Sequence, residues 1–299
     1  MCHLLKQVRY YLLKVSGVSC IDVLTSQAIE IKAKATVSAC GPWVDNLREL
    51  DKSKKGSQLH LTKGVHLVFP HSKIPLKTSM YFDIEDGRMI FAIPRGGVTY
   101  VGTSDTDYDS SIDRVVATKK DAEYILKAVN QTFPNVQLDF KDIVSNWAGL
   151  RPLIHQEGKS PSELSRKDEI FQSKSGLISI AGGKLTGYRK MAQRIVDLVS
   201  KKLHADFKTC STSQIFLVED ALKGQEQVEA YLSKIKLEVK KLNLEPYYAW
   251  YLVTTYGKQS QLILDFFKQF DDSPEIALAR AEVKFGLENE MITSLSDYF

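Results

Sequence analysis

The sequence predicts an α+β fold followed by an α-helical C-terminal domain. Two observations support this fold class. Short β-branched and aromatic runs between Ser79 and Gly102 are separated by Asp-Gly and Gly-Gly turns, whereas from about Thr212 onward the pattern favours helices alone. The composition, 43% hydrophobic and 25% charged, is ordinary for a globular protein. We therefore place a boundary at 205–212, between a mixed α/β part and a helical part.

Composition and motifs exclude several classes of protein. A formal net charge of +4 over 299 residues is too small to indicate a nucleic-acid-binding protein. No apolar run approaches ~18 residues, and residues 1–11 lack the features of a signal peptide, so we expect no membrane span. The four cysteines form no CxxC pair and no cluster with histidine, which favours reduced thiols in a cytosolic protein over disulfides or a metal site.

The first predicted strand runs from Ala28 to Ala39, where apolar and polar residues alternate as in a half-buried strand. It ends at the turn Cys40-Gly41-Pro42, and a short helix follows to Leu50. Further along the chain, tight turns separate runs that predict an antiparallel sheet. The strands predicted here are His66–Phe69, Ser79–Asp83, Arg88–Ile93 and Val98–Gly102, with 94–97 as the last turn.

The helices are predicted from caps and periodicity. Thr118 and Asp121 form a capping-box signature at the start of an amphipathic helix that ends at Thr132. Another helix starts after Gly182-Gly183 and runs to about Leu203. Two strands, 143–147 and 177–181, lie between these helices, and the helical part contains predicted helices at 225–242, 245–256, 258–270 and 274–287, with Gly257 as a C-cap.

The strand at 177–181 leads directly into Gly182, Gly183 and Lys184, where a helix starts. Glycines allow a ligand to approach the backbone closely, and the N-terminus of a helix favours negative charge. Lys184 would add a positive charge at the same place. A tight turn with a solvated lysine is the alternative that the pattern leaves open. The sequence has neither a P-loop motif nor a G-x-G-x-x-G fingerprint.

Two arginines are candidates for binding an anion. Arg151 follows the strand predicted at 143–147 and is flanked by Gly149 and Pro152. A guanidinium held just past a strand end suits bidentate recognition of phosphate or carboxylate. Arg95 lies in a similar Pro/Gly context. A surface arginine at a turn is the alternative for both residues.

His66 is the one histidine of the six that opens an apolar strand after a glycine. Such an imidazole would face an interior and be available as a proton acceptor. A hydrogen-bonded structural histidine is the alternative. Neither His60 nor His66 has a nearby cysteine or carboxylate run at metal-ligand spacing, so we expect no metal site.

The helical part contains an aromatic group and a basic run. At helical spacing, the aromatic residues favour a packing face over a stacking platform. The lysines favour a solvated helix face, and weak attachment to an anionic membrane surface is left open. The aromatic residues are Tyr247, Tyr248, Trp250, Tyr251 and Tyr256, and the lysines are Lys234, Lys236, Lys240 and Lys241.

Five blocks occur in a fixed order along the chain: ACGPWVD at 39–45, KGVHLV at 63–68, 93–106 ending in VGTSDT, WAGLRPL at 147–153 and GGKLTGYRKM at 182–191. Together they resemble the FAD-dependent glycerol-3-phosphate dehydrogenase and glycerophosphate oxidase family. The match covers roughly Ile29 to Leu203, and the helical tail resembles that family's C-terminal domain.

The resemblance implies a D-amino-acid-oxidase-like flavoprotein that oxidises sn-glycerol 3-phosphate to dihydroxyacetone phosphate. Hydride would pass to FAD, and electrons would then pass to quinone or, in the oxidases, to oxygen. Arg151 and Lys184 match positions that hold the substrate phosphate, His66 matches a substrate-side histidine that assists deprotonation, and Arg95 stays undecided. The positions that match segments lying against FAD are Gly41, Pro42, Trp43, Gly182, Gly183, Leu185 and Thr186.

The resemblance also implies a domain organisation. Residues 1–48 would be a remnant of the FAD-binding domain, 49–145 an antiparallel substrate-binding region, 146–208 a return to the FAD-binding domain, and 209–299 a truncated helical domain. The short loop from Leu153 to Ser165 favours the dehydrogenase branch, because the oxidases have a long insertion there. We expect a cytoplasmic location, with peripheral contact at the inner face of the cell membrane and a homodimer left open.

Three functions remain open at this stage. The first is a dehydrogenase that uses quinone, and the second is a glycerophosphate oxidase that uses oxygen. The third is an inactive fragment unable to bind FAD, because the family's N-terminal third with its G-x-G-x-x-G motif has no counterpart in the chain. An amino or hydroxy acid in place of glycerol 3-phosphate is the alternative substrate.

Overall fold

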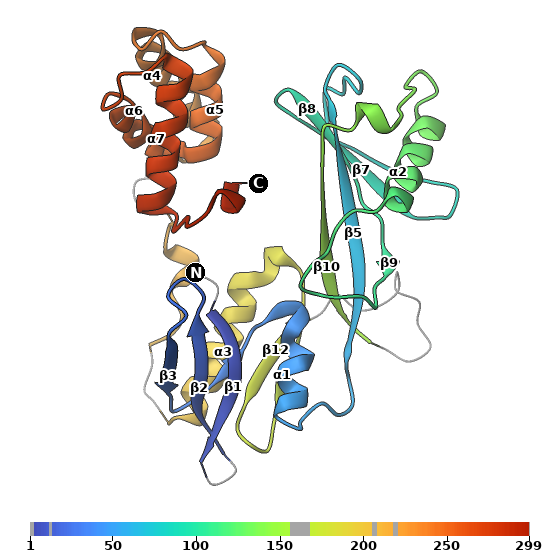
Figure 1. The fold of residues 1–299 in the computed structure, drawn as a ribbon, viewed down its shortest axis with the longest axis vertical. Coiled ribbons are helices and arrows are strands. Elements are labelled where there is room, and N and C mark those ends of the chain that lie inside the picture. The colour runs from blue at the N-terminus through green and yellow to red at the C-terminus, as the bar shows by residue number, and fades with distance from the viewer. Residues whose placement is uncertain (1–2, 12–13, 156–167, 205–207, 218–220, 299) are drawn as a thin grey trace. The chain divides into compact units, whose positions relative to one another are not determined.

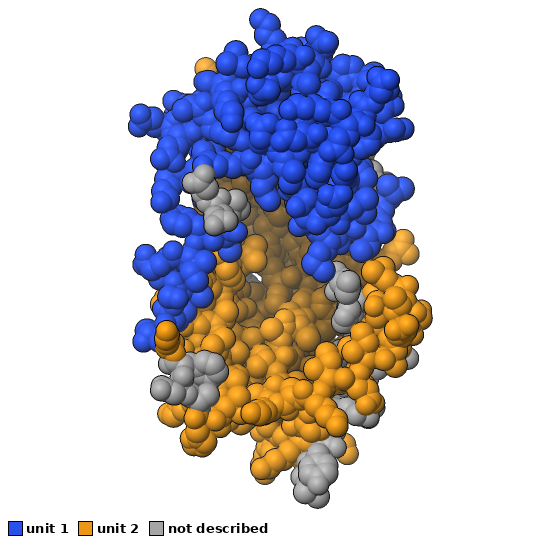
Figure 2. Space-filling model, turned by 90° about the vertical axis from the view of Figure 1, so that its left-hand side faces the viewer, with its two compact units in different colours: residues 1–3, 209–299 blue, residues 4–208 orange. Residues whose placement is uncertain are grey.

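The computed structural model describes residues 3–11, 14–155, 168–204, 208–217 and 221–298. The loop predicted between Leu153 and Ser165 falls largely on residues 156–167, outside the described residues. The chain divides into two compact units, residues 4–208 and residues 209–299 together with 1–3. Figure 2 shows the two units in different colours.

The larger unit is organised around an antiparallel sheet with the strand order β10-β5-β8-β7-β6, in which β9 also pairs with β5 (Figure 1). The strand β5 (Leu59–Pro70) is the longest, and β10 (Ser145–Ile154) pairs with it over ten residues at the edge of the sheet. The other strands are β6 (Met80–Asp83), β7 (Met89–Arg95), β8 (Val98–Gly102) and β9 (Thr106–Asp107).

One face of this sheet is covered by the helix α2 (Lys119–Thr132), which buries its apolar residues against alternate residues of the strands. On β5 these alternate residues are Val65, Leu67 and Phe69, all nearly inaccessible to solvent. Because strand side chains alternate between the two faces, the even-numbered residues of β5 point to the opposite face. Gly64 and His66 therefore lie on the face of the sheet away from α2.

Two further sheets complete the larger unit. The first has the order β1-β2-β3, formed by β1 (His3–Tyr11), β2 (Lys14–Asp22) and β3 (Ala28–Lys32). The second has the order β11-β12-β4, formed by β11 (Asp168–Gln172), β12 (Ile178–Gly182) and β4 (Val37–Ser38). Within it, β4 runs parallel to β12. The helices α1 (Val44–Leu50) and α3 (Tyr188–Lys202) follow β4 and β12 along the chain.

The described residues of the smaller unit form four α-helices, as the sequence predicts: α4 (Gly224–Lys241), α5 (Tyr247–Tyr256), α6 (Ser260–Phe267) and α7 (Pro274–Asn289). Gly257 ends α5 with a φ of 55°, which confirms the predicted C-cap. Three of the five aromatic residues, Tyr248, Tyr251 and Tyr256, pack against the core of this unit. Tyr247 and Trp250 keep 54% and 36% of their surface exposed.

Several predicted elements need correction. The strand predicted from Ala28 to Ala39 is two strands, β3 and β4, which belong to different sheets because the chain bends at residues 34–35. The strands β1 and β2 are not among those predicted from the sequence. The helix predicted at 258–270 begins with a 3₁₀ turn at Gly257–Gln259 and becomes α-helical only at Ser260. Among the described residues, no helix combines the length and apolar character needed to cross a membrane.

Candidate active site

The open face of the central sheet brings His66 and Arg151 together. In the register of the two strands, His66 lies opposite Trp147, Gly64 lies opposite Gly149, and Arg151 lies opposite Thr62. All of these residues lie on the face away from α2, because each is two positions from the next along its own strand. The Arg151 side chain extends over Gly64, toward His66.

His66 is positioned by aromatic neighbours. Its imidazole is stacked on the indole of Trp147, and Tyr100 presents an edge at a centroid distance of 6.4 Å. A Cβ on Gly102, the β8 partner of His66, would overlap the imidazole ring, so the absence of a side chain there makes room for it. Burial, and then the positive charge of Arg151, hold the pKa of His66 below its ordinary value of 6.5. The Nδ1 atom is buried and finds no hydrogen-bond partner among the residues that the structure describes. A neutral imidazole with an unused nitrogen can accept a proton.

Arg151 is held by the segment that follows β8. Its Nη1 donates to the carbonyl of Ser104 at 3.1 Å and to the Asp105 carboxylate at 3.1 Å, and its Nη2 donates to the Thr103 hydroxyl at 2.9 Å. The guanidinium side chain keeps 26% of its surface exposed. A fixed and partly exposed guanidinium on an open sheet face can bind phosphate or carboxylate.

Two predictions about the local context of these residues are wrong. Arg151 does not follow a strand end but lies inside β10, which continues through Pro152 to Ile154. Proline is tolerated there because β10 is the edge strand of its sheet, where one side of the backbone needs no ladder partner. His66 does not open its strand either, since β5 begins seven residues earlier at Leu59.

A second candidate region lies at the ends of two parallel strands. The strands β4 and β12 run in the same direction, so the turns that follow them are found at the same edge of the sheet. After β4 comes the 3₁₀ turn Gly41–Trp43, and β12 ends at Gly182, which is followed by Gly183. The turn at 41–43 contacts both β12 and β10. In open α/β sheets, ligands bind in the crevice outside such carboxyl ends.

Three glycines of this region have positive φ angles, which other residues rarely adopt. Gly41, Gly182 and Gly183 have φ angles of 55°, 76° and 81°. A Cβ on Gly41 would meet no atom within 4 Å, whereas one on Gly183 would lie 2.7 Å from the sulfur of Met191. Trp43 is 43% exposed, and its indole nitrogen donates to Asp113 at 2.8 Å.

Lys184, Leu185 and Thr186 are all exposed, and Leu185 retains 90% of its surface. The helix predicted to start at Lys184 begins later, because the 3₁₀ turn Leu185–Gly187 precedes α3. The side chain of Lys184 makes no capping hydrogen bond with this turn. The positive charge of Lys184 therefore lies on the surface, next to the Gly182-Gly183 turn.

The structure does not bring Arg95 to the other candidates. Arg95 is the last residue of β7, pairs with Val98 and is exposed, and Val98 in turn pairs with Pro70 at the end of β5. Arg151 lies opposite Thr62, eight residues from Pro70 along β5, which corresponds to about 26 Å at ~3.3 Å per residue. Arg95 and Arg151 are therefore at opposite ends of the sheet.

The residues that support His66 and Arg151 are not predicted from the sequence. Trp147 and Tyr100 surround the imidazole, and Gly64 and Gly102 leave the space that the two side chains occupy. The alternation of side chains along β5 places His66 and Gly64 on one face, but cross-strand neighbours depend on the register between strands far apart in sequence.

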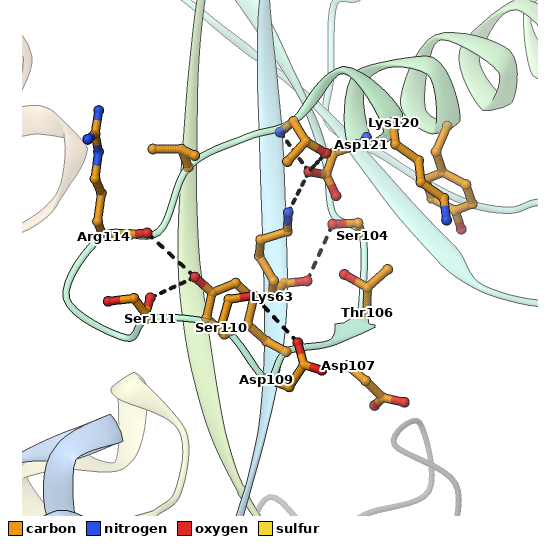
Figure 3. A pocket seen from close by; sticks show the side chains of 14 residues that line it. Lys63, Ser104, Thr106, Asp107, Asp109, Ser110, Ser111, Arg114, Lys120 and Asp121 are labelled. Atoms are coloured by element: carbon orange, nitrogen blue, oxygen red, sulfur yellow. Dashed lines mark hydrogen bonds and ion pairs between the residues drawn. The ribbon is translucent and has the colours of Figure 1, made fainter.

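A separate cavity of about 850 Å³ lies between the start of α2 and the loop after β9 (Figure 3). Lys63 points into it from β5 and forms a buried ion pair with Asp121 at 2.6 Å. Tyr108 closes the loop with hydrogen bonds to the carbonyls of Ser111 and Arg114. His66, Arg151 and Lys184 do not line this cavity. In the part of the chain that the structure describes, no group of three or more histidine, cysteine or carboxylate side chains could hold a metal ion.

Comparison with known proteins shows the family of the chain. The family model of FAD dependent oxidoreductases matches residues 6–189, and the chain belongs to this family. The resemblance found in the five sequence blocks is thereby confirmed, as is the predicted fold class.

Within the family, the chain is similar to glycerol-3-phosphate dehydrogenases. It is 45% identical to the aerobic glycerol-3-phosphate dehydrogenase of Bacillus subtilis (strain 168) over 98% of this chain and 54% of that protein. The corresponding enzyme of Staphylococcus aureus (strain MRSA252) is 44% identical over 95% and 52%. The solved structure of the Bacillus halodurans glycerol-3-phosphate dehydrogenase complexed with FAD is 42% identical, with a TM-score of 0.88 over 99% of this chain and 58% of that one. The chain thus spans about half the length of the curated relatives it matches.

Proposed function

We propose that the chain provides the substrate-binding sheet and part of the cofactor site of an FAD-dependent glycerol-3-phosphate dehydrogenase. The observation that supports this proposal best is the placement of Arg151 and His66 on one open sheet face, with a cation and a neutral imidazole side by side. In this proposal, residues 49–145 form the substrate-binding region and residues 146–208 return to the FAD-binding domain. The helical residues 209–299 form a separate domain.

The residues at the ends of β4 and β12 fit part of an FAD site. The left-handed backbone at Gly41 and Gly182, and the open space where Gly41 lacks a side chain, allow a planar ring to approach the main chain. Pro42, Trp43, Gly183, Leu185 and Thr186 belong to the same two turns. The pyrophosphate fingerprint G-x-G-x-x-G is absent from the sequence, so these turns account for part of the cofactor site and not for all of it.

The mechanism assigns one task to each side chain. Arg151 would bind the phosphate of sn-glycerol 3-phosphate, and Lys184 would supply a second positive charge at the Gly182-Gly183 turn. His66, whose imidazole is kept neutral by burial and by Arg151, would accept the proton of the carbinol hydroxyl as the carbon is oxidised to dihydroxyacetone phosphate. Bound FAD would supply the two-electron acceptor for the hydride. Electrons would then leave to quinone, with oxygen as the alternative acceptor of a glycerophosphate oxidase.

The test compares the 299-residue chain with the complete product of its gene, each incubated with FAD and freed of excess by gel filtration. We expect sn-glycerol 3-phosphate to bleach the bound flavin without oxygen, and Arg151→Ala and Lys184→Ala to weaken this reaction. Lys77→Ala, an exposed lysine on the loop after β5, is the control. Unchanged reduction in both site variants would contradict the site assignment. A colourless 299-residue chain beside a yellow complete product would favour the inactive-fragment alternative.

The electron acceptor and the substrate class need their own comparison. Reoxidation of the reduced flavin by a soluble quinone, faster than by dissolved oxygen, would support the dehydrogenase over the oxidase. A panel of amino acids and hydroxy acids should fail to compete with sn-glycerol 3-phosphate, because Arg151 and Lys184 together suit a phosphate dianion better than a single carboxylate. Competition by a carboxylate at the same concentration would shift the proposal to a different substrate.

We also propose a weak peripheral contact between the basic face of α4 and anionic membranes. Lys234, Lys236, Lys240 and Lys241 are exposed on this helix, next to Leu237, which is 63% exposed. Each surface cation adds about 1 kcal/mol of attraction to an anionic bilayer. Sedimentation with vesicles containing phosphatidylserine, but not with phosphatidylcholine vesicles, would support the contact. If a variant with all four lysines changed to glutamine sediments with these vesicles as much as the unaltered chain does, the contact is refuted.

A further inference from the structure

Gly64 leaves the space in which the Arg151 guanidinium lies. A Cβ built on Gly64 would be 2.7 Å from Nη2 and 2.8 Å from Nη1 of Arg151, and 2.7 Å from the hydroxyl oxygen of Thr103. These separations are shorter than van der Waals contact allows, so an alanine at position 64 would force the guanidinium or the Thr103 segment to move. The φ angle of Gly64 is not in the left-handed region, so the backbone does not itself require glycine at this position.

Three groups then fix the orientation of the guanidinium in this space. The Thr103 hydroxyl accepts from Nη2, while the Ser104 carbonyl and the Asp105 carboxylate accept from Nη1. The Asp105 side chain is itself only 19% exposed, so its charge is partly shielded from water. Together Gly64, Thr103, Ser104 and Asp105 form what we call the guanidinium site.

We propose that Gly64 and Asp105 are positioning residues that hold Arg151 ready to bind an anion. Ordering a long arginine side chain before the ligand arrives removes an entropy cost that binding would otherwise have to meet. The nature of the ligand, a phosphate ester, rests on the function proposed above. The geometry of the guanidinium site does not depend on it.

The proposal differs from a purely electrostatic role for Asp105 in the sign of one effect. If Asp105 acted only through its charge, its removal would leave more positive charge at the site, and anions would bind more tightly. If Asp105 positions Arg151, removing its carboxylate loosens the guanidinium, and anions bind less tightly. Asp105→Leu is close in size and removes both the charge and the oxygen that accepts from Nη1, so the sign of the change in anion affinity shows which effect dominates.

His66 gives a readout that needs no ligand. The positive charge of Arg151 is, after burial, the second cause of the lowered pKa of His66. Moving the guanidinium away should therefore raise the pKa of His66, which nuclear magnetic resonance of the imidazole can follow in the 299-residue chain. Assignment of the His66 signal comes from its loss in His66→Asn.

The experiment compares Gly64→Ala with Gly149→Ala, its direct partner on β10, where a new Cβ would meet no atom within 4 Å. For each protein, a pH titration gives the pKa of His66. Separate binding titrations give the affinity for inorganic phosphate and for sn-glycerol 3-phosphate. We expect Gly64→Ala to raise the pKa and to weaken anion binding roughly tenfold to a hundredfold, the size of lost hydrogen bonds to a charged group. Gly149→Ala should match the unaltered protein in both measurements.

Each outcome decides the proposal. Gly64→Ala with an unaltered His66 titration and unaltered anion affinity overturns it, and so does tighter phosphate binding in Asp105→Leu. If Gly64→Ala fails to fold, Thr103→Val replaces it, because this change removes an acceptor without altering charge, and it should raise the pKa of His66 in the same direction. If the unaltered chain binds neither anion while Gly64→Ala still shifts the titration, the guanidinium site stands and the proposed function fails.

Discussion

The imidazole of His66 lies on the indole of Trp147, with ring centroids 4.8 Å apart and ring planes inclined by 12°. The two residues are direct partners across β5 and β10, and Tyr100 on β8 approaches both rings. Two neighbouring strands, β10 and β8, thus contribute one aromatic group each to the surroundings of the His66 imidazole. This cluster removes water from one side of the ring and is consistent with its lowered pKa.

Trp147→Ala should raise the pKa of His66 toward 6.5, because burial is the largest cause of its shift and the indole covers one face of the ring. Proton resonance of the imidazole across the pH range measures this change. Trp250→Ala, which removes a tryptophan from the smaller unit, should leave the titration of His66 as it is. A variant without the Trp147 indole but with an unchanged pKa would mean that the indole contributes little to the burial of His66.

The folding stability of the larger unit should fall as the pH drops from neutral. The pKa of His66 is lowered in the folded chain, so the unfolded chain takes up the proton first. The contribution of the neutral imidazole to folding stability is therefore complete above about pH 6.5 and is lost as the pH falls through the pKa of His66 in the folded chain. Urea unfolding at a series of pH values should show a smaller loss in His66→Gln. Identical pH profiles for the two proteins would contradict this assignment.

The buried ion pair between Lys63 and Asp121 connects β5 to α2 and should be costly to break. The two side chains are 10% and 7% exposed, and Asp121 also forms the capping box with Thr118. Lys63→Met would leave a buried carboxylate without its cation, which we expect to lower the free energy of unfolding by about 3–5 kcal/mol. Chemical unfolding measures this loss.

The matched control for this ion pair is exposed. Lys127 and Glu85 form an ion pair with side chains 67% and 71% exposed, so Lys127→Met should cost less than about 1 kcal/mol. If Lys63→Met and Lys127→Met lower the free energy of unfolding by comparable amounts, burial of the Lys63–Asp121 pair adds nothing to its contribution to stability.

Gly183→Ala should destabilise the turn before α3. The residue has a φ of 81°, and a Cβ there would crowd the sulfur of Met191 at 2.7 Å. The left-handed conformation alone costs an alanine roughly 1–2 kcal/mol. Gly187→Ala is the control, because its φ is −88° and its Cβ would meet the same sulfur at an ordinary 3.8 Å. Thermal unfolding compares the two, and a melting temperature lowered as much by Gly187→Ala would refute the explanation.

Local patterns predict local structure well in this chain. The capping box at Thr118 and Asp121 is present, with both of its hydrogen bonds, because it depends on residues three positions apart. The same reasoning locates Gly257 at the end of α5. The alternation at Ala28–Ala39 is equally local, yet it does not reveal that β3 pairs with β2 while β4 pairs with β12. The choice of partner strand depends on contacts that a local pattern does not contain.

Sequence patterns predict the fold class, the family blocks and the residue types that could bind an anion or accept a proton. Which of these residues lie side by side follows from the folded structure alone. Arg151 lies inside β10, and its guanidinium extends over Gly64 toward His66. Arg95 lies at the other end of the sheet. The physical reason is the strand register. His66 and Trp147 are 81 positions apart in the chain, but the hydrogen-bonded pairing of β5 with β10 makes them direct neighbours in the sheet.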